Sequence, residues 1–167
     1  RQFTSIDDWI AAFQAQWTHM YDVVLRGFNI GELTQAQVYS QPFVSALTAD
    51  CIQKGMDVHE GGCRYSQTLG DIQNKVYADI PDALVAIDEL VYKQRLYSVD
   101  ELIAVCASNF AGESAEQVRL RMQRAPKFGN DLGAPEKVYR VLNDFVASIS
   151  RSRKGFLGFA KRDTRVG

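Results

Sequence analysis

The chain has 167 residues, enough for one domain and too few for two of ordinary size. Hydrophobic residues make up 46% and charged residues 23%, a composition typical of folded proteins and not of disordered ones. The 19 Lys and Arg residues balance 20 Asp and Glu residues, which argues against a nucleic-acid-binding surface because such surfaces need a basic excess.

No apolar run approaches the roughly 20 residues of a membrane span, and the first residues carry neither the basic nor the apolar region of a signal peptide. We therefore expect a cytoplasmic protein that binds neither membrane nor nucleic acid. Cys51, Cys63 and Cys106 are odd in number and far apart in sequence, which predicts reduced thiols and not a disulfide framework or a CxxC metal site.

The first predicted element is a helix from about Ile6 to Arg26, because apolar side chains recur there at steps of three and four. Ser5 is a suitable N-cap for it. We expect Gly27 or Gly31 to end the helix, and residues 31–41 to have turn character.

Pro42 is suited to the first turn of a second helix, expected to run to about Lys54 and to end at Gly55. A polar stretch over residues 57–66 follows and contains a double glycine at 61–62. Adjacent glycines indicate unusual backbone angles or a close approach of the backbone to a neighbouring group.

Residues 76–80 are the best strand candidate, and a helical pattern resumes at Pro81. Two capping boxes, beginning at Ser98 and Ser114, each predict a helix start. Pro135 is expected to begin the last helix, and a solvated basic tail follows from residue 150. The local patterns therefore predict a mostly α chain of five or six helices with one or two extended stretches.

Four segments resemble, in order and spacing, motifs of the glycyl radical enzymes, the pyruvate formate-lyase-like family. The resemblance extends over roughly residues 3–146, and its most specific part is the fourth segment. The segments are A-D-C-I-Q-K-G (49–55) with G-G-C-R-Y (61–65), A-D-I-P-D-A-L-V-A-I (78–87), N-F-A-G (109–112) and A-P-K-F-G-N-D (125–131).

The resemblance implies that residues 1–167 are a partial pyruvate formate-lyase-like domain, an internal segment that supplies helices to the α/β ten-stranded barrel of these enzymes. Neither the family's G-C-x-E cysteine loop nor its R-V-x-G-Y glycyl loop is matched, and Arg165-Val166-Gly167 is only a superficial echo of the latter. We therefore expect no catalytic residue, no metal site and no activity in this chain alone.

For the complete enzyme the resemblance implies an anaerobic lyase, decarboxylase or dehydratase that breaks a C–C or C–heteroatom bond of a small substrate. Its glycyl radical is installed by a radical-SAM activase, and the full-length protein is expected to form a homodimer. The implied partners of this chain are the remainder of the enzyme and the activase, and no cofactor is expected within the chain itself. The alternative is a non-catalytic helical interaction module, or a subunit that completes a split radical enzyme.

The substrate-binding candidates lie in the glycine-rich stretch, and they are His59, Glu60, Cys63, Arg64 and Tyr65. The forked guanidinium of Arg64 suits a carboxylate or sulfonate, which would make the substrate anionic. A histidine beside a carboxylate is able to do acid–base work, although a solvated loop pair is the simpler interpretation of His59 and Glu60. The alternative for Arg64 is that it fixes a helix end or pairs with a local aspartate.

Overall fold

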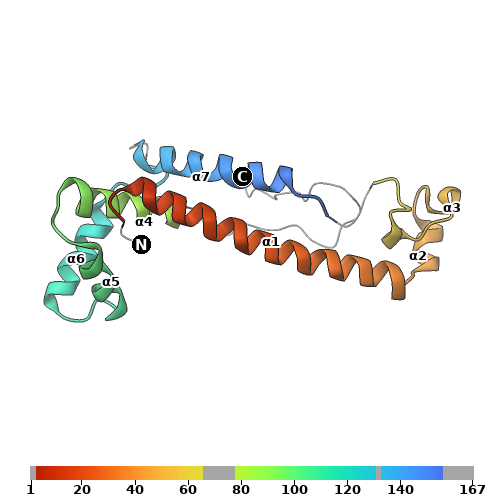
Figure 1. Ribbon diagram of the computed structural model, residues 1–167, viewed down its shortest axis with the longest axis horizontal. Coiled ribbons are helices and arrows are strands. Elements are labelled where there is room, and N and C mark those ends of the chain that lie inside the picture. The colour runs from red at the N-terminus through yellow and green to blue at the C-terminus, as the bar shows by residue number, and fades with distance from the viewer. Residues whose placement is uncertain (1–2, 66–77, 131–132, 156–167) are drawn as a thin grey trace. The chain divides into compact units, whose positions relative to one another are not determined.

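The computed structural model describes residues 3–65, 78–130 and 133–155, and within them it contains helices and turns but no β-strand (Figure 1). This confirms the mostly α expectation for the segment. The chain divides into two compact units, the first made of Arg1–Ala15 with Lys75–Phe145 and the second of Gln16–Asn74 with Val146–Gly167. None of the described helices is both long enough and apolar enough to cross a membrane.

Helix α1 (Ile6–Val38) is longer than predicted, because it runs through both Gly27 and Gly31. Its start agrees with the prediction: the Asp8 N–H donates to the Ser5 hydroxyl at 3.4 Å, and the Ser5 N–H donates to the Asp8 carboxylate at 3.1 Å. A glycine inside a helix costs only about 1 kcal/mol relative to alanine, so a helix with a buried face continues through it.

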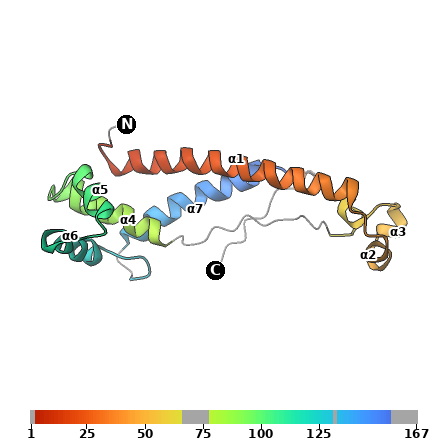
Figure 2. The ribbon, with the colours of Figure 1, turned by 90° about the horizontal axis from the view of Figure 1, so that it is seen from below.

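The structure has two short helices where the sequence predicts a single second helix. They are α2 (Pro42–Leu47) and α3 (Cys51–Lys54), which lie side by side in Figures 1 and 2. The chain turns between them at Asp50, whose φ of 74° is left-handed and cannot belong to a continuous helix. The predicted end at Gly55 is confirmed by its left-handed φ of 62°. A single 3₁₀ turn, η1 (Val58–Glu60), follows.

The prediction of a strand over residues 76–80 is wrong for the part of this range that the structure describes. Asp79 and Ile80 instead form the first turn of α4 (Asp79–Ile87). Residues 76–77 lie outside the described residues. Pro81 is compatible with a first helical turn, and acidic side chains at this end favour the helix dipole. Helix α4 continues as the π-helical segment η2 (Asp88–Lys93).

The capping box at Ser98 is confirmed and the one at Ser114 is wrong. Ser98 precedes α5 (Val99–Ala107) and exchanges hydrogen bonds with Glu101. Helix α6 (Glu113–Arg124) instead begins one residue before Ser114, with Gly112 as its N-cap at a φ of 93°. Helices α4, α5 and α6 lie together in both views (Figures 1 and 2).

The last helix, α7 (Ala134–Ser152), begins where Pro135 predicts. Its buried side is marked by Leu142 and Val146, which are four residues apart and almost fully buried. Further buried side chains of the first unit come from α4, η2, α5 and α6, and they include Leu84, Val85, Leu90, Leu102 and Val118.

Candidate functional site

The glycine-rich stretch that holds the predicted site is organised by one carboxylate, Asp57. Its Oδ2 accepts hydrogen bonds from the Gln41 N–H at 2.7 Å and from the Ser45 hydroxyl at 2.8 Å. Its Oδ1 accepts from the His59 N–H at 2.9 Å, and the His59 Nδ1 lies 3.2 Å from the same oxygen. Asp57 therefore ties η1 to the start of α2, sixteen residues earlier in the chain.

Burial raises the pKa of Asp57, but hydrogen bonds from the His59 N–H, the Ser45 hydroxyl and the Gln41 N–H outweigh it and hold the pKa below its ordinary value. The carboxylate is therefore ionised at neutral pH. An acceptor with this many donors stabilises the loop and is unsuited to act as a general base.

The double glycine has the two backbone properties that the sequence predicts. Gly61 has a φ of 89°, in the left-handed region that favours glycine. A Cβ on Gly62 would lie only 2.2 Å from the carbonyl oxygen of Met56, so no larger residue fits there without a backbone shift. The close approach at Gly62 is therefore to the loop itself.

A small apolar core joins the loop to helix α3. Cys51 and Cys63 are both buried and form one core cluster with Val58. Both are free thiols, as is the exposed Cys106. Burial raises the pKa of the Cys51 thiol, which keeps it protonated and a poor nucleophile. The Cys63 thiol donates to the carbonyl of Tyr65 at 2.7 Å.

His59 and Glu60 are engaged in the structure of the loop. The Asp57 N–H donates to Glu60 Oε2 at 3.0 Å, which with Asp57 completes a capping box around η1. His59 contacts Asp57 through both its backbone and its ring. Asp57 is not among the predicted site residues, although the D-x-x-E spacing over residues 57–60 is a sequence signal for this capping role.

Arg64 and Tyr65 are exposed site candidates, as is Glu60, whose carboxylate is held by the capping box. The Arg64 guanidinium grips Asp50, with Nη2 at 2.7 Å from Oδ1 and Nε at 3.2 Å from both carboxylate oxygens. This hydrogen bonding lowers the pKa of Asp50. The Arg64 side chain is nevertheless 59% exposed, and Tyr65 is 81% exposed. The local aspartate foreseen as an alternative partner of Arg64 is therefore present, at the residue before α3.

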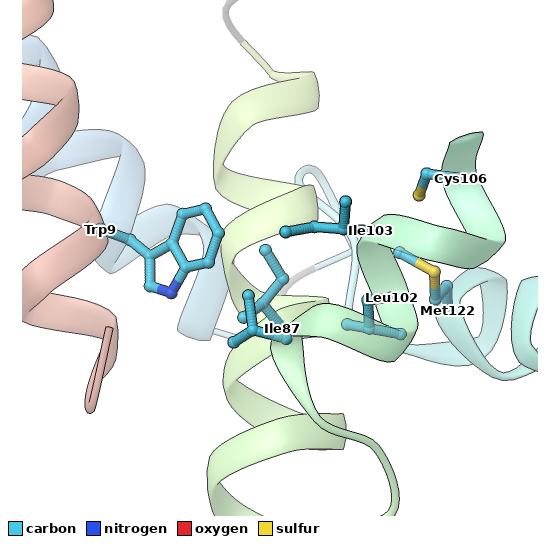
Figure 3. Close-up of a pocket in the computed structure, with 7 residues that line it drawn as sticks. Trp9, Ile87, Leu102, Ile103, Cys106 and Met122 are labelled. Atoms are coloured by element: carbon cyan, nitrogen blue, oxygen red, sulfur yellow. The ribbon is translucent and has the colours of Figure 1, made fainter. Parts of the chain in front are cut away.

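The first unit contains a separate apolar pocket of about 220 Å³. Figure 3 shows Trp9 of α1 facing Ile87 of α4 and Ile103 of α5, with Met122 of α6 and Cys106 beyond them. The Trp9 indole N–H is directed elsewhere, to the Tyr92 hydroxyl at 2.8 Å. Because its lining offers no charged group, this pocket is unsuited to orient an anionic substrate. Within the described ranges, no group of three His, Cys, Asp or Glu residues is placed to hold a metal ion.

A family model described as pyruvate formate lyase-like matches residues 1–158 of the chain. The chain is 33% identical to trans-4-hydroxy-L-proline dehydratase of Clostridioides difficile, over 90% of this chain and 19% of that protein. It is 26% identical to (2S)-3-sulfopropanediol dehydratase of Klebsiella oxytoca, over 84% of this chain and 17% of that protein. It thus spans about one fifth of the length of these curated relatives.

The fold is similar to that of a glycyl radical enzyme from Archaeoglobus fulgidus, with a TM-score of 0.83 and 29% identity over 96% of this chain and 20% of that one. It also resembles the B12-independent glycerol dehydratase from Clostridium butyricum in its glycerol-bound form, with a TM-score of 0.84, 23% identity and coverage of 95% and 20%. At the latter identity the likeness concerns the fold alone. These matches confirm the expectation of a helical segment of the glycyl radical enzyme barrel.

Proposed function

The chain belongs to the pyruvate formate lyase-like family of glycyl radical enzymes, and we propose that it forms an internal segment of a radical dehydratase or lyase. The observation that carries this proposal is the family match over residues 1–158, together with similarity to dehydratases over most of the chain. We propose further that residues 1–167 are a partial domain without the cysteine loop and the glycyl loop, and are inactive alone.

The complete enzyme would then need a glycyl radical, installed by a radical-SAM activase, and would act as a homodimer in the cytoplasm under anaerobic conditions. The remainder of the enzyme and the activase would be the partners of this segment. The helices described above would contribute to the enclosure of the reaction, because a radical intermediate must be kept from water and oxygen.

We propose that the loop over residues 57–65 contributes to the substrate pocket of the complete enzyme. Arg64 and Tyr65 would face the substrate, since their side chains are exposed. His59, Glu60 and Cys63 would position the loop, since each is held by contacts within it. The substrate would be a small molecule with a hydroxyl or sulfonate leaving group, and Arg64 would favour an anionic one.

The experiment is an anaerobic assay of the full-length protein that contains this segment, after activation by a radical-SAM activase. The candidate substrates are those that the relatives' names give: trans-4-hydroxy-L-proline, (2S)-3-sulfopropanediol, isethionate and glycerol. Elimination of water or sulfite from one of them is the expected result. An activated protein that converts none of these, nor any related hydroxy or sulfonate compound, would contradict a dehydratase or lyase function.

A further inference from the structure

Helix α2 presents an uncovered apolar face to solvent. Phe43 is 76% exposed and Leu47 is 75% exposed, and a spacing of four residues places them on the same side of the helix. Val44 lies beside them and is also exposed. Together Phe43, Val44 and Leu47 form what we call the α2 apolar face.

The orientation of this face is fixed by hydrogen bonds on the other side of the helix. Ser45 is buried, and its hydroxyl donates to Asp57 at 2.8 Å and accepts from the Val58 N–H at 2.9 Å. With about 3.6 residues per turn, Ser45 lies nearly opposite Phe43 and Leu47. The apolar side chains are therefore held outward by the same carboxylate that organises the loop.

The sequence around the α2 apolar face has the composition of an interface core. No charged residue occurs from Tyr39 to Ala49, in a chain in which 23% of the residues are charged. Depletion of charge with a retained aromatic side chain distinguishes the buried centre of an interface from ordinary surface. Ile52 of the neighbouring α3 is exposed as well, so the apolar character continues beyond α2.

We propose that the α2 apolar face is an internal interface that packs against an uncharged, apolar surface of the same polypeptide outside residues 1–167. The proposal rests on the proposed function. The chain matches the fold of the Archaeoglobus fulgidus enzyme over 96% of its own length but covers 20% of that enzyme, so about four fifths of such a protein is available to cover this face. A charged occupant is disfavoured because the face offers no partner for a buried charge.

The test compares two single cysteines in the full-length enzyme, both made in a Cys106→Ser background that removes the exposed native thiol. Leu47→Cys probes the α2 apolar face, and Gln53→Cys probes an exposed polar position of α3. Maleimide labelling at each position is followed by peptide mass spectrometry. In the 167-residue chain both cysteines should react at similar rates, whereas in the full-length enzyme Leu47→Cys should react more than about tenfold more slowly than Gln53→Cys.

Equal rates at the two positions in the full-length enzyme would overturn the interface. Protection of Leu47→Cys that disappears when the enzyme is diluted to monomers would assign the face to a second copy, and would overturn the internal interface too.

As a second measurement, Phe43→Asp should lower the melting temperature of the full-length enzyme, and Gln53→Asp should not. If the enzyme shows a glycyl radical signal but the cysteine at position 47 reacts freely with maleimide, only the interface is contradicted. If that cysteine is protected from maleimide but the activated enzyme shows no radical, only the proposed function is contradicted.

Discussion

At the scale of single residues, Asp57 connects the stability of the loop to pH. Its pKa in the folded chain lies below the ordinary value of 3.8. A carboxylate with a lowered folded pKa contributes stability at pH values above its unfolded pKa, and this contribution is lost as the pH falls through the folded pKa. The loop over residues 57–65 is therefore expected to lose stability in acid.

Replacing Asp57 by asparagine should lower the free energy of unfolding by about 1–3 kcal/mol. The amide NH₂ of asparagine would replace one carboxylate oxygen and would face the N–H and O–H donors that this oxygen now accepts from. The stability of the variant should also depend less on pH below about 4 than that of the wild type. Urea unfolding at several pH values measures both effects. Asp144→Asn, at an exposed position of α7, is the control and should change little. Equal effects of the two substitutions would contradict the role of Asp57.

The two glycine positions Gly62 and Gly27 should respond to alanine in opposite directions. A Cβ at Gly62 would collide with the Met56 carbonyl oxygen at 2.2 Å, so Gly62→Ala should destabilise the chain by roughly 1–3 kcal/mol. Gly27 lies within α1 and a Cβ there meets nothing within 4 Å, so Gly27→Ala should stabilise the chain by about 0.5–1 kcal/mol. Thermal unfolding of the two variants should show shifts of opposite sign, and a tolerated Gly62→Ala would refute the packing of this loop.

The role of Arg64 is separable from its contact with Asp50 by a pair of variants of the full-length enzyme. Arg64→Lys keeps the charge but loses the fork, and Asp50→Asn removes the carboxylate that the fork grips. If Arg64 also binds an anionic substrate, Arg64→Lys should raise KM by about tenfold or more, equivalent to at least about 1.4 kcal/mol. Asp50→Asn should mainly lower the melting temperature. Normal KM in folded Arg64→Lys enzyme would confine Arg64 to the scaffold.

At the scale of elements, local patterns predicted helix starts better than helix ends. Ser5, Ser98 and Pro135 each precede or begin a helix because capping and a fixed proline φ act within a few residues. Gly31 did not end α1, since a modest local cost does not stop a helix that has a buried face. The left-handed turn at Asp50 was not foreseen, because a positive φ at a residue other than glycine depends on surrounding contacts.

The two candidate capping boxes give a matched test of helix stability. Ser98→Ala removes the hydroxyl that accepts from the Glu101 N–H at 3.2 Å and should cost about 1 kcal/mol. Ser114→Ala should have an effect within about 0.5 kcal/mol, because Gly112 and not Ser114 is the N-cap of α6. Chemical denaturation of both variants provides the comparison, and a larger loss for Ser114→Ala would contradict the observed start of α6.

At the scale of the whole molecule, the mostly α fold and the family were predictable from the sequence, because helical periodicity and four ordered motifs extend over most of the chain. The contacts within the loop over residues 57–65 could not be predicted from the sequence. The meeting of Cys51 with Cys63 and the pairing of Arg64 with Asp50 depend on the turn between α2 and α3, which no local pattern specified. The side chains that face solvent could therefore be sorted from those that hold the loop only with the structure.

We propose that this helical segment of a glycyl radical enzyme bears no radical itself. The most direct measurement is the EPR spectrum after anaerobic incubation with a radical-SAM activase, recorded on the full-length protein and on the 167-residue chain. We expect a glycyl doublet from the full-length protein and none from the chain alone. A doublet on the 167-residue chain would show that the chain itself carries a radical. No doublet from the full-length protein, under conditions that activate a known family member, would contradict its assignment as a working glycyl radical enzyme.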